Sequence, residues 1–495
     1  MSRLFYKFLF FPRAGRTFVF YAVGLTFARE KATIKREKKP EGSALYMIDF
    51  AHASLDTLIA KGGHACACGR VHQVDMDFLC IEPGAVKAIP RGLAAIGGKK
   101  PFIVCDVHTK AAAWDAVRPV LEAAGIAYVL YCFPMEHVEP DEYAMGCLTM
   151  AFDPSCDCVM GIGSGVINDC CKVLCHVIGR KQMIVGTAPS MDGYASNSSA
   201  MIRERIKVSL YGACPAAIVC DTEIMRNAPM RMLWAGFGDM LAKYIALCEW
   251  RISHLVTGEY YCENIAGLMR ESLRRIVESA PGLKDRDEKA VRATVEGLVL
   301  SGIAMSYAGI SRPASGLEHY FSHLWEMMAL DRGTPYELHG IQVGVGTLIT
   351  LNLYKQIRRI IPDRKTAEDF IASFRDEEWQ AMIRRIFGKA AETVIWQEHN
   401  VFHKNDKARH AARLDKIMEG WPEIQRFIAE ELPEAETVAA MMHNLGMPMT
   451  PDDIGVSRED TENAFIGSRD IRDKYLSSSL LWDLGLLYKI KLAEW

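Results

Sequence analysis

The sequence predicts an α/β N-terminal domain with a parallel sheet, followed by an all-helical C-terminal domain. Between about residues 100 and 220, short apolar runs alternate with segments of helical spacing, and the connections are short. Beyond about residue 221, apolar residues recur three and four positions apart, which is typical of amphipathic helices. A chain of 495 residues is too long for one compact core, so two or three domains are expected.

The alternating segments of the first half are assigned in chain order. Four apolar runs are expected to be strands, at residues 100–107, 126–133, 157–163 and 182–190. Two segments are expected to be helices that end in glycine, at residues 109–125 and 166–179. Strand, helix and strand in succession form βαβ units and therefore a parallel sheet, whose ligands bind at the carboxyl ends of the strands.

Segments of helical spacing dominate the second half, starting with residues 231–250, 260–280 and 287–309. The predicted organisation is an extension at residues 1–46, an α/β domain at 47–220 and a helical domain at 221–495. Ligand sites favour the interfaces between domains, so the cleft between the last two is the expected active site.

The first 46 residues are apolar and aromatic before they become charged. Arg13 and Arg16 interrupt the apolar part, and each run is shorter than the roughly 20 residues of a membrane helix. Three interpretations stay open: a weak membrane-surface anchor, a start assigned too early with the first domain beginning near Met47, or a disordered extension. No stable membrane insertion is expected.

Composition limits the cellular setting. The net charge is −3, which gives no support for a nucleic-acid surface. The chain has 15 cysteines, and several of them, such as Cys170, Cys171 and Cys175, are too close in sequence to pair with one another. Reduced thiols and a cytoplasmic location are therefore expected.

A glycine-rich turn joins a predicted strand to a predicted helix. Gly161, Gly163 and Gly165 remove side chains there, so that backbone amides and the positive end of the helix can meet a phosphate. A tight turn without a ligand is the alternative. Asp106 ends another strand, where it would either bond ribose hydroxyls or cap the helix that starts near Thr109.

Small polar side chains follow the next strand. Thr187, Ser190 and Ser196 lie in the segment "GTAPSMDGYAS" and offer hydrogen-bond donors at the same edge of the sheet. Together with the glycine turn and Asp106, they favour a phosphate-containing ligand over a simple turn.

A metal site is predicted in the helical half. His319 and His323 are four residues apart and share one helix face. His339 is expected in a short connection before a glycine, and Asp239 at the start of a helix beside two glycines. Imidazoles and a carboxylate with open positions suit Zn²⁺, Ni²⁺ or Fe²⁺, whereas two hydrogen-bonded histidines on a buried face are the alternative.

The segment "GGHACACGRVH" places Cys66 and Cys68 between His64 and His72. Sulfur and imidazole this close are compatible with structural zinc. However, C-x-C is not the spacing of a zinc knuckle, and no second pair follows at the usual distance. A β-hairpin with reduced thiols is therefore the favoured interpretation.

Five segments occur in one order: "GIGSGVIND", "GTAPSMDGYAS", "GFGDMLAKY", "SRPASGLEHYFSHLWEM" and "LHGIQVGVGT". Together they resemble the sn-glycerol-1-phosphate dehydrogenases, within the larger group of glycerol dehydrogenase, iron-containing alcohol dehydrogenase and dehydroquinate synthase. The resemblance runs from about Met47 to the C-terminus, and the tail "RDKYLSSSLLWDLGLL" is similar to bacterial members. It implies a Rossmann-like N-terminal domain of the dehydroquinate synthase kind.

The resemblance implies roles for individual residues. Asp239, His319 and His339 match the metal ligands, and the substrate contacts implied are Asp192, Asp239 and His323. Asp239 and His323 are the catalytic candidates. Ser164 stands where many relatives have a glycine. The cofactor-binding candidates are Asp106, Gly163, Ser164, Gly165, Val166, Ile167, Asp169, Thr187, Ser190 and Ser196.

The implied reaction is the reversible reduction of dihydroxyacetone phosphate by NADH or NADPH to sn-glycerol 1-phosphate, for glycerophospholipid synthesis. A divalent metal acts as a Lewis acid on the C2 carbonyl oxygen, and neutral ligand imidazoles are required, so activity falls at acid pH. Asp106 favours NAD over NADP because it would repel the extra phosphate. Relatives imply a homodimer or larger homo-oligomer.

Other functions remain as alternatives. A glycerol dehydrogenase would perform the same chemistry on an unphosphorylated polyol. In the sequence, only Arg312 in "SRPASG" could distinguish these two functions. It would do so if it binds the substrate phosphate, and not if it is a surface or helix-capping residue. A lyase of the dehydroquinate synthase kind and a non-catalytic metal-binding scaffold are the remaining candidates.

Overall fold

The computed structural model describes residues 48–204 and 206–493. Residues Met47–Trp495 form one compact unit, so the predicted division at residue 220 into two domains stays a prediction. The three interpretations of residues 1–46 lie outside the described residues. In the part that is described, no helix is long and apolar enough to cross a bilayer.

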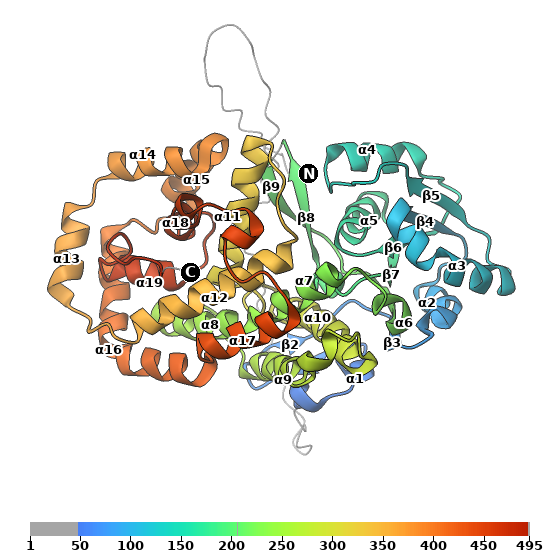
Figure 1. The fold of residues 1–495 in the computed structure, drawn as a ribbon, viewed down its shortest axis with the longest axis horizontal. Helices are drawn as coiled ribbons and strands as arrows, with labels where there is room; N and C mark the ends of the chain where they lie inside the picture. Colours follow the sequence, from blue (N-terminus) through green and yellow to red (C-terminus); the bar gives the residue numbers. More distant parts are fainter. Residues whose placement is uncertain (1–47, 205, 494–495) are drawn as a thin grey trace, which may run out of the picture. The chain divides into compact units, whose positions relative to one another are not determined.

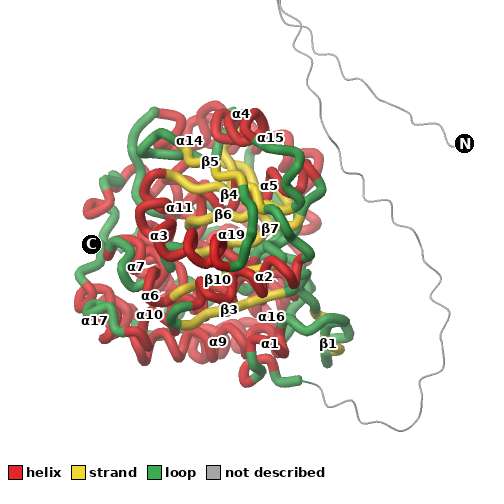
Figure 2. The backbone as a smooth tube through the Cα atoms, turned by 90° about the vertical axis from the view of Figure 1, so that its right-hand side faces the viewer, coloured by secondary structure: helices red, strands yellow, loops and turns green. Residues whose placement is uncertain are grey.

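The described residues contain a six-stranded parallel sheet, whose strands are drawn in yellow in Figure 2, from one edge at β5 to the other at β3. Its strands, in spatial order, are β3 (Phe78–Glu82), β10 (Ala217–Asp221), β7 (Lys181–Gly186), β6 (Cys158–Gly163), β4 (Pro101–Asp106) and β5 (Val129–Phe133). The predicted parallel sheet and its four assigned strands are confirmed, while β3 and β10 are additional.

Helices cover both faces of the sheet because its strands are apolar on both sides. The helices of this part are α2 (Ile89–Ile96), α3 (Val107–Ala123), α4 (Glu142–Ala151) and α5 (Gly165–Ile178). Cys105 is buried in the core formed with α2 and α3, and the adjacent Val104 in the core formed with α4 and α5. The side chains of successive residues of β4 therefore pack into the helical layers on opposite faces of the sheet.

The strand order fixes where a ligand can enter. The chain runs from β4 outward to β5, and then returns to the other side of β4 to form β6. Connections on either side of this point leave in opposite directions, which opens a crevice at the carboxyl ends of β4 and β6. Asp106 ends β4 and Gly163 ends β6, so both predicted residues lie at this switch point.

Two small antiparallel hairpins complete the strands of the described residues. β1 (His64–Ala65) pairs with β2 (Val71–His72), as the sequence predicts for the cysteine-containing segment. β8 (Ser198–Arg203) pairs with β9 (Ile206–Tyr211), which the sequence does not predict. β8 contacts α5 and β9 contacts a helix of the C-terminal part, so this second hairpin bridges the two parts.

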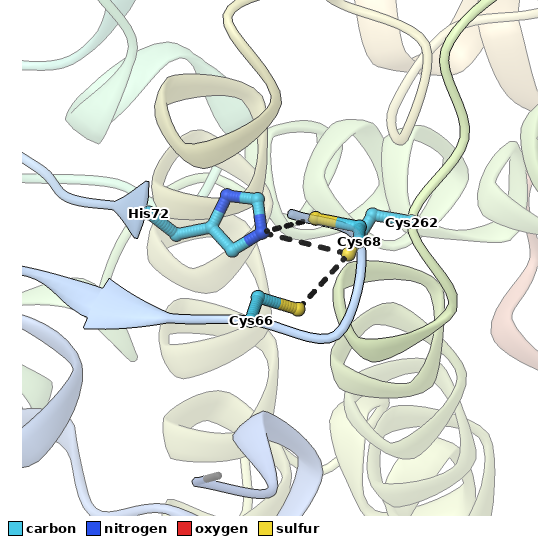
Figure 3. A group of neighbouring side chains, drawn as sticks. All are labelled: Cys66, Cys68, His72 and Cys262. Atoms are coloured by element: carbon cyan, nitrogen blue, oxygen red, sulfur yellow. Dashed lines mark hydrogen bonds between the residues drawn. The ribbon is translucent and has the colours of Figure 1, made fainter. Parts of the chain in front are cut away.

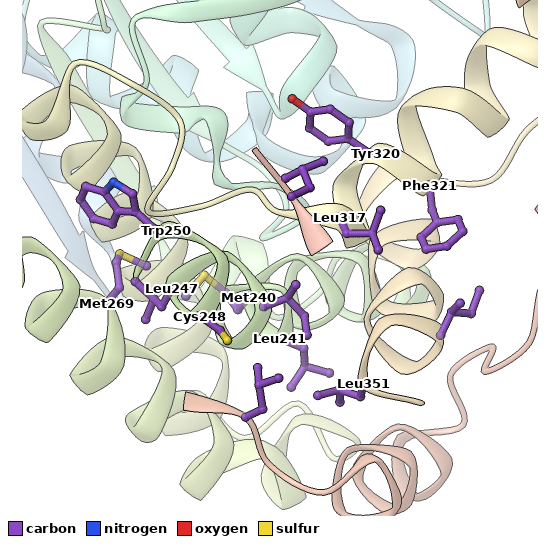
Figure 4. Packing of buried hydrophobic residues seen from close by; sticks show 14 of the residues in the cluster. Met240, Leu241, Leu247, Cys248, Trp250, Met269, Leu317, Tyr320, Phe321 and Leu351 are labelled. Carbon is purple, nitrogen blue, oxygen red and sulfur yellow. The ribbon is translucent and has the colours of Figure 1, made fainter. Parts of the chain in front are cut away.

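Apart from the short α1 (Leu55–Leu58), the remaining α-helices of the described residues follow the sheet in sequence, and those from about residue 364 onward lie mostly at the left of Figure 1. A buried apolar cluster that includes Met240, Trp250 and Leu351 fills the space between them (Figure 4). They are α6 (Thr222–Met225), α7 (Met230–Leu241), α8 (Lys243–Thr257), α9 (Glu263–Ser279), α10 (Glu288–Ala308), α11 (Leu317–Arg332), α12 (His339–Ile357), α13 (Arg364–Ser373), α14 (Asp376–Phe387), α15 (Ala391–Gln397), α16 (Lys407–Glu431), α17 (Ala435–Leu445), α18 (Arg458–Gly467) and α19 (Ser477–Asp483).

Two local predictions in this part are wrong. Asp239 lies in the last turn of α7 rather than at a helix start, and the helical segment 231–250 divides at Ala242 into α7 and α8. His339 is the first residue of α12 rather than part of a connection. The glycine that follows His339 suggested a turn, but it is a point of close helix contact instead.

Candidate active site

Close contact between α7 and α12 positions two of the predicted ligands. A Cβ atom added to Gly340 would lie 1.9 Å from the carbonyl oxygen of Ala235, and one on Gly238 would lie 2.2 Å from that of Gly340. Only glycine permits backbones to approach this closely. The contact sets Asp239, near the end of α7, beside His339 at the start of α12.

The predicted metal ligands converge in the helical part. Oδ1 of Asp239 lies 3.3 Å from Nε2 of His319, and the ring centroids of His319 and His339 are 5.3 Å apart. Potential ligand atoms form two neighbouring groups, each within 4.8 Å: Asp192, Asp239 and His319, and His323, Glu326 and His339. The predicted triad thus spans both groups, and its role as a ligand set stays a prediction.

Buried carboxylates orient both imidazoles. Nδ1 of His319 donates to Glu318 at 2.8 Å. Nδ1 of His339 contacts Ser322 Oγ at 2.8 Å and the Glu326 carboxylate at 3.2 Å. With Nδ1 occupied, Nε2 is the remaining ligand atom on each ring, which is the usual arrangement of metal-binding histidines. The donor set therefore fits a divalent cation.

Strong local charges surround Asp239. Burial raises the pKa of this carboxyl, but Lys243 and His319 outweigh that effect and hold it well below its usual value. Burial lowers the pKa of His319, while its hydrogen bonds to Asp239 and Glu318 raise it to a net value above the ordinary one. The lowered pKa favours the carboxylate form of Asp239, which is the form that binds a metal.

Lys243 is a buried residue of this cluster that the sequence interpretation did not assign. Its ammonium group lies 2.7 Å from Asp192 Oδ2 and 3.1 Å from Asp239 Oδ1, and it donates to the carbonyl of Ala314. Its spacing of four residues from Asp239, within a segment of helical pattern, is the signal that could have identified it, although the structure places the two residues in successive helices. Lys243 ties the two aspartates together.

The loop that follows β7 connects this cluster to the glycine turn. At one end, the hydroxyls of Ser190 and Ser164 are 2.6 Å apart. At the other end, the backbone N–H of Asp192 donates to Asp239 Oδ2 at 2.9 Å, and its carboxylate accepts from Ser301 at 2.9 Å. Two residues of one loop thus span the distance between the two predicted sites.

The glycine turn has the geometry of an anion site. Ser164 is the N-cap of α5, yet its side chain makes no cap hydrogen bond, because its hydroxyl instead meets Ser190 and accepts from Tyr194. A Cβ on Gly163 would lie 2.6 Å from that of Ile167, which packs beneath the turn. The first amides of α5 are thereby left to face the crevice, where a phosphate would be stabilised.

Several cofactor-binding candidates also make hydrogen bonds to the backbone that stabilise the fold. Asp106 accepts from the backbone N–H of Thr109 at 2.7 Å, so its predicted capping role is confirmed. Asp169 accepts from Ala200 N–H at 3.0 Å, and Ser196 donates to the carbonyl of Ser198 at 3.0 Å. These contacts anchor β8. Cofactor contact by the candidates around the turn, Val166, Asp169, Thr187 and Ser196 included, stays a prediction.

Arg312 differs from both interpretations of its role. It is buried and donates to Glu259, to Ser253 and to the carbonyl of Tyr475. Because each of its three nitrogens is engaged, it neither caps a surface helix nor offers a free fork to a phosphate.

Positive charge near the two histidine groups comes from elsewhere. Burial, followed by the charges of Arg472, His339 and Lys207, holds the pKa of His323 well below its ordinary value. Lys207, on β9, pairs with Glu326. Among the described residues, no partner bonds Nδ1 of His323. The lowered pKa favours the neutral imidazole of His323, whose unused polar atom lies near two cations, Arg472 and Lys207, that no sequence pattern singles out.

Known proteins share this sequence and architecture. Residues 80–229 match the family described as iron-containing alcohol dehydrogenase. Glycerol-1-phosphate dehydrogenase [NAD(P)+] of Halalkalibacterium halodurans is 34% identical over 299 residues, covering 59% of this chain and 75% of the relative. That of Bacillus licheniformis is 26% identical over 437 residues, covering 88% of this chain and 96% of the relative.

A solved structure agrees on the fold. Maleylacetate reductase from Rhizobium sp. strain MTP-10005 has a TM-score of 0.52 at 15% identity, covering 85% of this chain and 97% of that one. A sequence identity this low supports a shared fold and carries no information about function. The sequence relatives carry the family assignment, and they bear out the resemblance drawn from the five motifs. The chain therefore belongs to the glycerol-1-phosphate dehydrogenase family.

Proposed function

We propose that this oxidoreductase catalyses the metal-dependent, reversible reduction of dihydroxyacetone phosphate to sn-glycerol 1-phosphate with NADH or NADPH. One observation carries the proposal: the loop from Ser190 to Asp192 bonds the glycine turn at one end and Asp239 at the other. A dinucleotide on the turn would then bring its reactive ring close to a substrate held at the cation. The names of the sequence relatives support the same reaction.

Asp239, His319 and His339 would hold one divalent cation, with Zn²⁺ or Ni²⁺ preferred and Fe²⁺ as a third candidate. When bound, the cation supplies Lewis-acid polarisation of the C2 carbonyl. Glu318 and Glu326 keep Nε2 of the two imidazoles directed at it. Lys243 bonds both Asp239 and Asp192 and so fixes the two carboxylates relative to each other.

The carboxyl ends of β4 and β6 are the proposed dinucleotide site. The pyrophosphate would meet the amides at the start of α5, where a helix dipole favours negative charge. The Asp106 carboxylate would bond the ribose hydroxyls and disfavour a 2′-phosphate, so NAD is preferred over NADP. When bound, the nicotinamide supplies the hydride.

The substrate phosphate is proposed to lie near His323. Lys207 and Arg472 provide the positive charge there. The neutral His323 would hydrogen-bond the substrate through its unused Nδ1 and carry a proton toward the new hydroxyl oxygen. A phosphate requirement of this kind distinguishes the proposal from a glycerol dehydrogenase.

The test is NADH oxidation by the metal-loaded protein with dihydroxyacetone phosphate and, separately, with dihydroxyacetone. The phosphorylated substrate should be strongly preferred. An Arg472→Met variant should lose activity with the phosphorylated substrate, mainly through KM, and should behave as the parent with dihydroxyacetone. Preference for dihydroxyacetone would favour the glycerol dehydrogenase alternative, and inactivity with both would favour a lyase or scaffold.

A second variant tests the ligand set. His339→Ala should abolish activity even with added metal, because one of three protein ligands is removed. Full activity with added metal would exclude His339 from the set.

The cellular setting belongs to the same proposal. The 15 cysteines are free thiols in the structure, which is typical of proteins from a reducing compartment such as the cytoplasm. We also propose a homodimer or larger homo-oligomer, which light scattering of the purified chain would test.

A further inference from the structure

Three cysteines and a histidine meet outside the active site (Figure 3). Cys66 follows β1, Cys68 lies in the hairpin turn, His72 ends β2, and Cys262 immediately precedes α9. One ligand atom from each lies within 4.8 Å of the others. The hairpin alone supplies the C-x-C pair and the histidine, and a residue nearly 200 positions later completes the set.

The separations between these atoms match a tetrahedron around one ion. With Zn–S near 2.3 Å and Zn–N near 2.05 Å, tetrahedral edges are about 3.8 Å for sulfur to sulfur and about 3.6 Å for sulfur to nitrogen. Sγ of Cys66 and Cys262 are 3.7 Å apart, and Sγ of Cys262 is 3.6 Å from Nε2 of His72. Sγ of Cys68 is 3.2 Å from the same nitrogen.

The surroundings prepare His72 for this role. Its Nδ1 lies 3.0 Å from the carbonyl oxygen of Tyr307, so Nδ1 carries the proton and Nε2 offers its lone pair to the sulfurs. The side chain is fully buried and packs against the rings of both Phe50 and Tyr307. The hydroxyl of Tyr260 is 3.3 Å from Sγ of Cys68, where it would stabilise a thiolate.

The hairpin turn explains why both sulfurs reach one point. The N–H of Gly69 donates to the carbonyl of Cys66, and the N–H of Cys66 to that of Arg70. Gly69 has φ +82°, a conformation that other residues rarely adopt. The tight turn folds Cys68 back over Cys66, and the pair faces Cys262.

We propose that Cys66, Cys68, His72 and Cys262 bind one structural Zn²⁺ that fastens the N-terminal hairpin to the start of α9. Four protein ligands fill a tetrahedral site and leave no open position, so the ion is structural rather than catalytic. Three thiolates select zinc over the harder cations that suit oxygen ligands. The site shares no residue with the proposed active site, and the inference holds whether or not the proposed reaction is correct.

A redox-active disulfide is the competing explanation. It would use only Cys66 and Cys262, whose sulfurs would have to close from 3.7 Å to about 2.05 Å. Cys68 and the tautomer of His72 would then have no role. The convergence of four ligand groups, rather than two, favours the metal.

The experiment uses the full chain, purified with reductant and without added zinc. Elemental analysis should find one zinc ion per chain that resists dialysis against a chelator. Titration with a thiol-reactive mercurial should release it. After exchange with Co²⁺, the protein should show a sulfur-to-cobalt charge-transfer band and the intense visible bands of a tetrahedral site. The proposed active site has only nitrogen and oxygen ligands, so it cannot produce the charge-transfer band.

Variants locate the ion. Cys262→Ser should lose the charge-transfer band and the chelator-resistant zinc, and its Tm should fall. Cys80→Ser, a partly buried thiol outside the cluster, should keep both. If Cys262→Ser fails to fold, the mercurial titration and cobalt spectrum of the unaltered chain still decide the question. A reduced, folded chain without zinc and without the charge-transfer band overturns the proposal. Equal loss of the charge-transfer band in Cys262→Ser and Cys80→Ser would also overturn it. So would a Cys66–Cys262 disulfide in a chain that binds no metal after reduction.

Discussion

A buried carboxylate lies behind each of the two imidazoles that we propose as metal ligands, His319 and His339. Glu318 and Glu326 bond Nδ1 of these rings, which leaves Nε2 available to the proposed cation. Spacing along one helix identifies the histidine pair from sequence. Glu318 is adjacent in sequence, but nothing local indicates that Glu326 serves the distant His339, since that contact depends on how α11 and α12 pack.

Metal affinity is predicted to fall in acid. Since Asp239 and Glu318 hold the pKa of His319 above its ordinary value, protons compete with the metal at higher pH than they would for a free imidazole. Below that pKa the apparent affinity should weaken about tenfold per pH unit, one proton being displaced per ion bound. Chelator competition at several pH values measures this.

Glu318→Gln provides the comparison for that titration. Gln keeps an acceptor for Nδ1 of His319 but removes the charge, so the decline should move to lower pH. An affinity that does not change with pH in the parent would contradict the account of this site.

Asp106 gives a second prediction at this scale. Asp106→Asn retains the helix cap, because Asn caps as well as Asp, but removes the charge that repels a 2′-phosphate. The ratio of kcat/KM for NADPH to that for NADH should rise about tenfold, equivalent to about 1.4 kcal/mol. Asp141→Asn makes the same change at the cap of α4 and should leave the ratio unaltered. An equal ratio in all three proteins would remove Asp106 from the cofactor site.

Elements bring these residues together through contacts that depend on glycine. The strand–helix alternation predicted four strands of the sheet, because each run is bounded by a glycine or followed by a long helix. β10 leads only into the short α6, and β3 is a half-exposed run, so neither carries that signal. Gly340 was misinterpreted for a related reason. A glycine at a helix contact and a glycine in a turn look alike in sequence.

Gly340→Ala tests the helix contact. The added methyl group would meet the carbonyl of Ala235, so α7 and α12 should separate, at a cost of about 1–3 kcal/mol in the free energy of unfolding. Metal affinity should fall by at least about tenfold as Asp239 and His339 move apart. Chemical denaturation and metal titration measure the two effects.

The control is Gly267→Ala in α9, where an added Cβ meets open space. That variant should bind metal normally and gain up to about 1 kcal/mol in stability, since Ala favours the helix. Normal metal binding by Gly340→Ala would show that the contact does not position the ligands.

At the scale of the whole molecule, one loop and one hairpin add polar and backbone contacts to the apolar core that the sheet shares with the helices. The loop after β7 bonds Asp239, and the β8–β9 hairpin contacts both α5 and α11. The order of segments in the chain predicts a cleft between two parts, but these connections are contacts over long sequence distances. The same is true of the cluster at Cys66, whose fourth member is 196 residues away.

We predict one cooperative unfolding transition for the unit of residues 47–495, because the sheet and the helices belong to one compact unit. NADH at 100 times its Kd should stabilise the whole unit by about 2.7 kcal/mol and raise its Tm. Differential scanning calorimetry with and without NADH measures both. A separate transition of the helical part that does not respond to NADH would mean that the two parts fold independently.

The central claim is that Asp239, His319 and His339 share one cation that faces the glycine turn. Anomalous diffraction at the metal edge, from crystals of the full chain grown with Zn²⁺ and NADH, tests it most directly. The account predicts a peak about 2.0–2.2 Å from the Asp239 carboxylate and from Nε2 of both histidines, on the side of the bound nicotinamide. A well-ordered site with no peak there, or a peak whose ligands exclude Asp239 or His339, would contradict it.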